Sequence, residues 1–186
     1  MLDSYTHPKR LPRVNRDNLD EKGKEIFDTI DQTRGGVWGP YTALMHVPEL
    51  ADRVASVGEY LRFHGRLPGF EREFAILLTA KLNQSRFEWV VHEPVARKEG
   101  LQEEYLEYVR SGKESELTPR LKLIVSLINS LSQEKVLSQK IYAELENNFS
   151  RDEIIELVSI AGFYQMLALV IAAFDVPEPE SQFPSF

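Results

Sequence analysis

Apolar residues recur along this chain at the three- and four-residue spacing of α-helices, and no stretch alternates as a strand would. Helices are expected from Asn18, from Pro48, over 70–82, over 85–99, over 101–109, from Thr118, over 138–147 and from Ser150. Glycine and proline interrupt the pattern at 31–40, at 67–69 and at Gly100, where we expect loops or helix ends. The sequence therefore predicts an all-α protein.

Two of the predicted helices are unusually apolar. Segment 70–82 is apolar on nearly every side, which is typical of a helix at the centre of a fold. Segment 158–174 is apolar enough to suggest a membrane span, but it is marginal in length and contains Tyr164 and Gln165. We therefore expect the last helix to be a buried core or subunit-interface helix, and we expect no membrane partner.

Composition and charge place the chain among soluble, single-domain proteins. It has 186 residues, of which 42% are hydrophobic and 27% charged. The net charge of −7 argues against nucleic acid or an anionic membrane as a partner, because both attract basic surfaces. The N-terminus lacks the apolar run of a signal peptide, so a cytoplasmic protein is expected. The expected organisation is an N-terminal arm (1–17), one helical domain (18–176) and a proline-rich tail (177–186).

The chain has no cysteine, which excludes disulfides, thiolate nucleophiles and sulfur-ligated zinc. His46 and His64 do not have the spacing of metal ligands, and there is no glycine-rich phosphate loop or serine-hydrolase motif. We therefore expect neither a metal nor a cofactor.

The stretch SRFEWVVH carries the first candidate chemistry. In a helix, Ser85, Glu88 and His92 share one face, and Glu88 lies four residues before His92. A neighbouring carboxylate would fix the tautomer of a histidine that transfers protons. However, Ser85-x-x-Glu88 is also a capping-box pattern, and capping is the favoured interpretation of Glu88 from the sequence alone.

Three further residues complete the candidate site. Glu73 falls among apolar neighbours on its helix, so its carboxylate either finds a partner or has its pKa raised by desolvation. A purely structural ion pair is an equally good explanation of this residue. Trp89 shares the face of His92 and could form the wall of a substrate pocket. Ser85, on the same face, and Tyr164, on the last helix, are also candidate substrate contacts.

The chain resembles the carboxymuconolactone decarboxylase family, which has the alkylhydroperoxidase D-like all-α fold. The phrases that carry the resemblance are GPYTALMHVPEL (39–50), LPGFEREFAILLTAKLNQSRFEWVVHEPVARKEGL (67–101) and ELVSIAGFYQMLALVIAAFDV (156–176). In the peroxidase branch of this fold, a glutamate precedes a Cys-x-x-Cys pair and a histidine. By spacing these positions fall on Glu73, on Ser85 and Glu88, and on His92, so thiol peroxidase activity is excluded.

The cysteine-free decarboxylase branch is the better match, and the resemblance implies a cofactor-free lyase that acts on a small lactone acid. His92 would donate or accept the proton, Glu73 would be its buried partner, and Glu88 would be a second acid or base. The pocket is expected between helices 70–82 and 85–99. The family also implies a homo-oligomer, such as a dimer, trimer or hexamer. The alternatives are a non-catalytic small-molecule-binding oligomer of this fold, or an isomerase or dehydratase.

Overall fold

The computed structural model describes residues 7–113, 116–181, 183 and 185–186, and within these residues it contains helices and no strand. The α-helices are α1 (Glu21–Arg34), α2 (Pro40–Leu44), α3 (Pro48–Glu59), α4 (Gly69–Leu82), α5 (Arg86–Lys98), α6 (Glu103–Ser111), α7 (Pro119–Asn129), α8 (Gln139–Asn148) and α9 (Arg151–Phe174). A 3₁₀ turn (η1, Arg16–Asn18) precedes α1, and π turns extend α3 (η2, Tyr60–His64) and α7 (η3, Ser130–Glu134). The predicted all-α class is confirmed.

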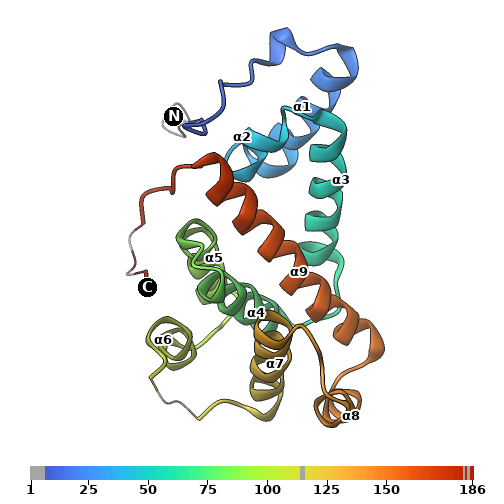
Figure 1. Cartoon of the computed structure of the whole chain (residues 1–186), viewed down its shortest axis with the longest axis vertical. Helices are drawn as coiled ribbons and strands as arrows, with labels where there is room; N and C mark the ends of the chain where they lie inside the picture. Colours follow the sequence, from blue (N-terminus) through green and yellow to red (C-terminus); the bar gives the residue numbers. More distant parts are fainter. Residues whose placement is uncertain (1–6, 114–115, 182, 184) are drawn as a thin grey trace.

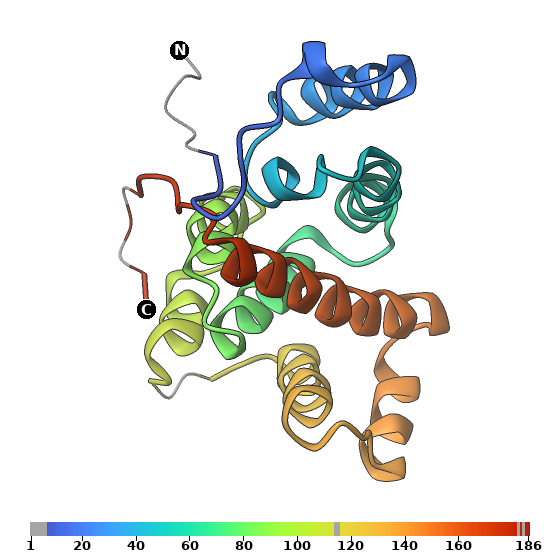
Figure 2. The same cartoon turned by 45° about the horizontal axis from the view of Figure 1, so that its top comes forward.

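Helix α4 lies at the centre of the bundle, as its apolar sequence predicts. It packs against α5, α6, α7 and α9, so that neighbours surround it in both views (Figures 1 and 2). Every residue from Glu73 to Ala80 is buried. One of these buried residues, Glu73, is a carboxylic acid, and its partner is described with the site below.

Polar caps set several helix starts where the sequence indicates them. The Thr118 side chain accepts a hydrogen bond from the backbone N–H of Leu121 and begins α7. At the start of α9, the Ser150 hydroxyl accepts from the Glu153 N–H at 3.3 Å. The Glu153 carboxylate in turn accepts from the Ser150 N–H at 2.7 Å, so this capping box is confirmed.

The first helix starts and ends later than predicted. Asn18 does not cap it, because Asn18 belongs to the η1 turn and Asp20 caps α1 by accepting from the Gly23 N–H. At the other end, α1 continues through part of the expected loop to Arg34 and stops at Gly35, whose φ of 68° favours glycine. The short α2 within 40–44 was not predicted, since five residues are too few to show a helical period.

The π turn η2 at the end of α3 is fixed from the opposite side by Glu156 of α9. The buried Glu156 carboxylate accepts hydrogen bonds from the backbone N–H groups of Arg66 and Leu67 and from the Tyr60 hydroxyl. A π turn holds one extra residue per turn and so changes the directions in which its side chains point. The anchored turn therefore carries Arg62 and Phe63 to a defined place beside α9.

Both ends of the described chain lie against the bundle. The Lys9 backbone N–H donates to Asp175 O at 3.2 Å, next to the end of α9. The tail folds back over the chain's own helices, and the Phe186 ring meets Trp89 of α5 edge-on at 5.4 Å. Residues 1–6 of the predicted arm and residues 182 and 184 of the predicted tail lie outside the described residues.

Helix α9 runs diagonally across the bundle between α2 and α8 (Figure 1). By length and composition it could cross a membrane, a test that core helices of soluble proteins also pass. One side of α9 is buried against α2, α4, α5 and α7, and the other side exposes Ile155, Val158 and Leu169. This two-sided character is what a core helix with an additional interface would show.

Candidate active site

The centre of the site is a histidine–carboxylate pair between α4 and α5. His92 Nδ1 lies 2.8 Å from Glu73 Oε2, and both side chains are almost completely buried. Because a carboxylate can only accept, Nδ1 carries the hydrogen and Nε2 is the atom left for other chemistry. Burial raises the pKa of Glu73, but the charges and hydrogen bonds of His92 and Arg72 outweigh it, so the pKa lies below its usual value.

Glu88 stands on the other side of the imidazole. Its Oε2 lies 3.6 Å from His92 Nε2, too far for a strong direct hydrogen bond. The side chain is buried, and desolvation raises the pKa of Glu88, although His92 and Arg62 partly oppose this. Glu88 is therefore the carboxyl of this site whose ionisation burial opposes.

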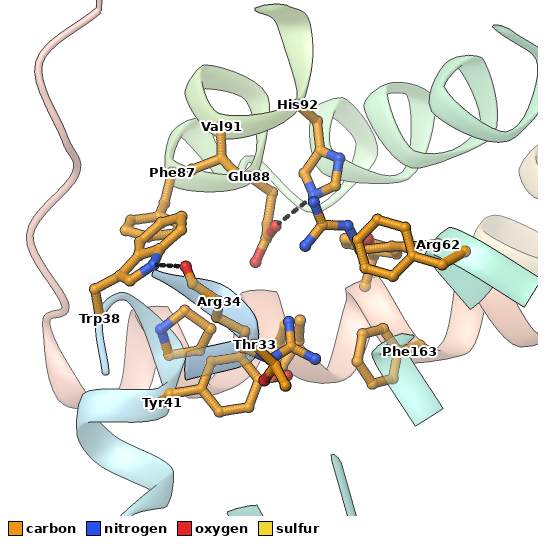
Figure 3. A pocket seen from close by; sticks show the side chains of 15 residues that line it. Thr33, Arg34, Trp38, Tyr41, Arg62, Phe87, Glu88, Val91, His92 and Phe163 are labelled. Atoms are coloured by element: carbon orange, nitrogen blue, oxygen red, sulfur yellow. Dashed lines mark hydrogen bonds and ion pairs between the residues drawn. The ribbon is translucent and has the colours of Figure 1, made fainter. Parts of the chain in front are cut away.

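The favoured sequence interpretation of Glu88 as a helix cap is wrong. Ser85 occupies the N-cap position of α5 but makes no side-chain capping bond, and its hydroxyl has no hydrogen-bond partner among the described residues. Glu88 instead turns inward to the His92 ring (Figure 3). The Glu88 carboxylate, which would have completed the capping box with Ser85, therefore faces the His92 ring inside the protein.

A cavity of about 180 Å³ opens next to these groups. Figure 3 shows its lining, in which the carboxyl of Glu88 and the ring of His92 point inward from α5. The remaining lining is largely aromatic or basic and comprises Thr33, Arg34, Trp38, Pro40, Tyr41, Gly58, Arg62, Phe63, Phe87, Val91, Phe163, Tyr164 and Leu167. The lining contains residues of α5 but none of α4, so of the two helices expected to bound the pocket, 85–99 does and 70–82 does not. Glu73 lies behind His92, and α1, α2, η2 and α9 form the other walls.

The three predicted substrate contacts have different positions. Tyr164 lines the cavity, and its ring meets the His92 ring edge-on at 5.0 Å. Burial raises the pKa of Tyr164 well above its ordinary value, so its hydroxyl keeps its proton.

Trp89 and Ser85 do not line this cavity. The buried Trp89 indole turns to the opposite side of α5, where Nε1 donates to Glu93 Oε2 at 3.0 Å. Ser85 lines a separate surface hollow beside Arg86 and Asp175. The helical-wheel argument fails for both. Ser85 is the N-cap of α5 and lacks helical backbone angles, so the wheel does not describe its direction. Trp89 directly follows Glu88, and consecutive helix positions point about 100° apart, so its side chain leaves the wall that Glu88 and His92 share.

Sequence reasoning did not identify Arg34, Tyr41 and Arg62, which also line the cavity. They come from α1, α2 and η2, and packing alone brings them together. The sequence has no local signal for this, apart from the GPYTAL phrase that contains Tyr41. Among the described residues, no group of three or more His, Asp or Glu side chains has a metal-binding arrangement.

No protein-family model matches the sequence, and no curated protein sequence is similar to it. Solved structures are similar in fold. A peroxidase-related protein with an alkylhydroperoxidase AhpD core from Ralstonia eutropha JMP134 has a TM-score of 0.77 at 17% identity, covering 94% of this chain and 95% of that chain. A peroxidase-related protein from Silicibacter sp. TM1040 has a TM-score of 0.74 at 16% identity, covering 96% of both chains.

The debrominase Bmp8 is also similar, with a TM-score of 0.69 at 15% identity over 90% of both chains. A cysteine-to-alanine variant of Bmp8 has been solved in complex with 2,3,4-tribromopyrrole. At these levels of identity the likenesses show the fold and nothing finer. The chain has an AhpD-like fold.

Proposed function

We propose that this protein is a cofactor-free acid–base enzyme that decarboxylates, or moves a proton on, a small carboxylated lactone or related cyclic acid. The observation that carries the proposal is the His92 ring, held at Nδ1 by Glu73 with Nε2 toward Glu88 and the cavity. A buried histidine with its tautomer fixed on one side and an open cavity on the other is arranged to transfer protons.

The residues fit the electron and proton movements of a decarboxylation. The bond from the ring carbon to the carboxylate breaks, CO₂ leaves, and the electron pair moves into a conjugated carbonyl of the substrate. Burial opposes ionisation of Glu88, and in its protonated form this carboxyl can donate a hydrogen bond to the oxygen where negative charge develops. For this last step His92 must carry a proton on both ring nitrogens: its Nε2 proton forms the new C–H bond and restores the carbonyl, and the ring is left neutral with Nδ1–H on Glu73.

The positions of Glu88 and Glu73 bear on the choice between an enzyme and the non-catalytic alternative, which gains if Glu88 is consumed by capping and Glu73 by an ion pair. Glu88 faces His92 instead of capping α5. Glu73 does pair with Arg72 at 3.2 Å, but its other oxygen holds His92 Nδ1 at 2.8 Å. The chain also contains no cysteine, so these residues cannot carry out the thiol chemistry of peroxidases. A small flat ring such as the pyrrole bound by the Bmp8 variant suits the aromatic lining of this cavity.

Turnover of a panel of cyclic acids, lactone acids included, tests the proposal. With nuclear magnetic resonance in D₂O, decarboxylation releases CO₂ and adds one deuterium at the ring carbon, whereas isomerisation releases no CO₂. His92→Asn should lower kcat by about 10²- to 10⁴-fold, since it removes the proton carrier. The matched control is His64→Asn, because His64 is an exposed histidine outside the cavity. Wild-type turnover by the folded His92→Asn protein would refute the assignment.

We also propose that the protein is a homo-oligomer. Apolar side chains that a lone subunit leaves exposed gather on α9, α3 and η2, among them Val57, Phe63, Ile155 and Leu169. We propose a second copy of this chain as the occupant, because exposed apolar patches commonly mark interaction sites and most oligomers are symmetric assemblies of one chain. Light scattering during size-exclusion chromatography measures the subunit number, and a monomer at every concentration would refute this proposal.

A further inference from the structure

The cavity contains two arginines without a carboxylate partner. Arg34 and Arg62 both line it, and neither forms an ion pair with a carboxylate in the described part of the chain. In contrast, Arg72, Arg97 and Arg110 each contact a buried glutamate. Both arginines are partly buried, and two such guanidinium groups at one cavity without an anion call for an explanation.

Arg34 is fixed but not fully hydrogen-bonded. Its Nη2 donates to Ala55 O at 2.8 Å, and its guanidinium lies 4.4 Å from the centre of the Tyr41 ring. These contacts hold the side chain in one orientation. Its Nε is buried and has no acceptor within the residues described, so one donor of this cavity-lining arginine is unused.

Arg62 and Tyr41 add further donors. The Arg62 guanidinium packs on the neighbouring Phe63 ring at 4.9 Å, and its charge is close enough to lower the pKa values of Glu88 and Tyr164. The Tyr41 hydroxyl is buried, and no residue of the described ranges is its hydrogen-bond partner. Burial raises the pKa of Tyr41, so this hydroxyl keeps its hydrogen and can donate.

The charges in the cavity do not balance without an anion. Behind the cavity the Glu73 carboxylate is paired with Arg72 and hydrogen-bonded to His92, and Glu88 is the carboxyl whose ionisation burial opposes. Two positive charges, Arg34 and Arg62, therefore face a space whose other walls are mainly aromatic (Figure 3). A small ring that bears a carboxylate satisfies both parts of this lining.

We propose that Arg34, Arg62 and Tyr41 form a carboxylate-binding subsite that sets the specificity of this cavity for small, flat, monocyclic acids. The subsite holds the acid group, and the ring lies against Trp38 and Phe87 with its reacting carbon toward His92. This inference rests on the proposed function for the identity of the cavity, but it concerns binding and does not require turnover.

The test compares benzoate with benzamide, which has the same ring and no charge, by isothermal titration calorimetry. Wild-type protein should bind benzoate at least tenfold more tightly than benzamide. Arg62→Met keeps the length and apolar stem of the side chain and should weaken benzoate binding by about tenfold to a hundredfold, with little effect on benzamide. Tyr41→Phe, which loses one hydroxyl and keeps the ring, should weaken benzoate binding by about threefold to tenfold.

Two controls make each outcome decisive. Arg53→Met removes an exposed arginine of α3 and should leave both affinities unchanged. His92→Asn should still prefer benzoate, so an inactive protein that retains this preference contradicts the proposed function only. Equal binding of benzoate and benzamide by wild type, or unchanged benzoate binding by Arg62→Met, would overturn the subsite.

Discussion

Replacing Glu88 by glutamine should make the protein more stable and less active at the same time. Glu88 is buried in the cavity wall with His92 Nε2 at 3.6 Å and no closer charged partner in the described ranges. Glutamine has nearly the same shape, so the substitution removes the ionisable group and leaves the packing intact. Measuring stability and activity together distinguishes an acid that takes part in the reaction from one that stabilises the fold.

The magnitude follows from two opposed contributions. A full charge pair at this separation is worth about 5 kcal/mol at an effective dielectric constant of 20, and removing a carboxylate from water costs several kcal/mol. Desolvation is the larger contribution, since the pKa of Glu88 is raised despite His92 and Arg62. Each unit of such a rise corresponds to about 1.4 kcal/mol of stability lost at pH values above both pKa values.

The sign of the pH dependence is fixed by the same shift. Below the ordinary glutamate pKa of 4.5, the residue is protonated in both folded and unfolded protein, and Glu88→Gln should match wild type. As pH rises, the unfolded chain ionises freely while the folded protein resists, so wild type loses stability relative to the variant. At neutral pH we expect Glu88→Gln to be more stable by about 1–2 kcal/mol, or a Tm higher by about 2–8 °C.

Melting temperatures measured by calorimetry from pH 4 to pH 8 test the predicted difference in stability. The kcat of Glu88→Gln should fall about 10²- to 10⁴-fold, because glutamine cannot supply a proton. The control is Glu144→Gln, at an exposed position of α8, and it should alter neither property. A variant that melts at or below wild type at neutral pH, or a difference that does not change with pH, refutes the electrostatic reasoning. Wild-type kcat refutes the role of Glu88 in the reaction.

Two other substitutions test the walls of the site. Gly39→Ala should destabilise the protein by about 2–4 kcal/mol in urea denaturation, because φ is +60° and the new Cβ would lie 2.5 Å from the Phe87 ring. Wild-type stability of this variant would contradict the packing around Phe87. Glu156→Gln should cost about 1–3 kcal/mol in the same assay, since an amide cannot accept all three hydrogen bonds that this carboxylate receives. An unchanged denaturation midpoint would show that the anchor of η2 is dispensable.

The two Ser-x-x-Glu patterns show where sequence reasoning succeeds and where it stops. Ser150 and Glu153 form a capping box at the start of α9, and the Glu153 carboxylate also accepts a hydrogen bond from Arg120. Ser85 and Glu88 have the same spacing, but their helix starts inside the fold, and His92 and the cavity place Glu88 elsewhere. Local chemistry predicts a cap in both cases, and only tertiary packing distinguishes them.

The remaining gaps have a similar cause. The Glu73–His92 pair could be proposed because both residues lie on adjacent, strongly patterned helices. Arg34 and Arg62 could not be proposed as neighbours, because 27 residues lie between them in the sequence and no helical period links α1 to η2. Residues that only tertiary packing brings together cannot be identified from the pattern of hydrophobic positions.

The π turn that carries Arg62 suggests how related proteins could change their ligands. A π turn contains one residue more than an α turn, and loss of that residue would rotate the side chains after it by about 100°. Such a deletion would withdraw Arg62 from the cavity while His92, Glu73 and Glu88 stayed in place on α4 and α5. Selectivity for the acid group could thus be gained or lost by a single-codon change in length, independently of the residues that move the proton.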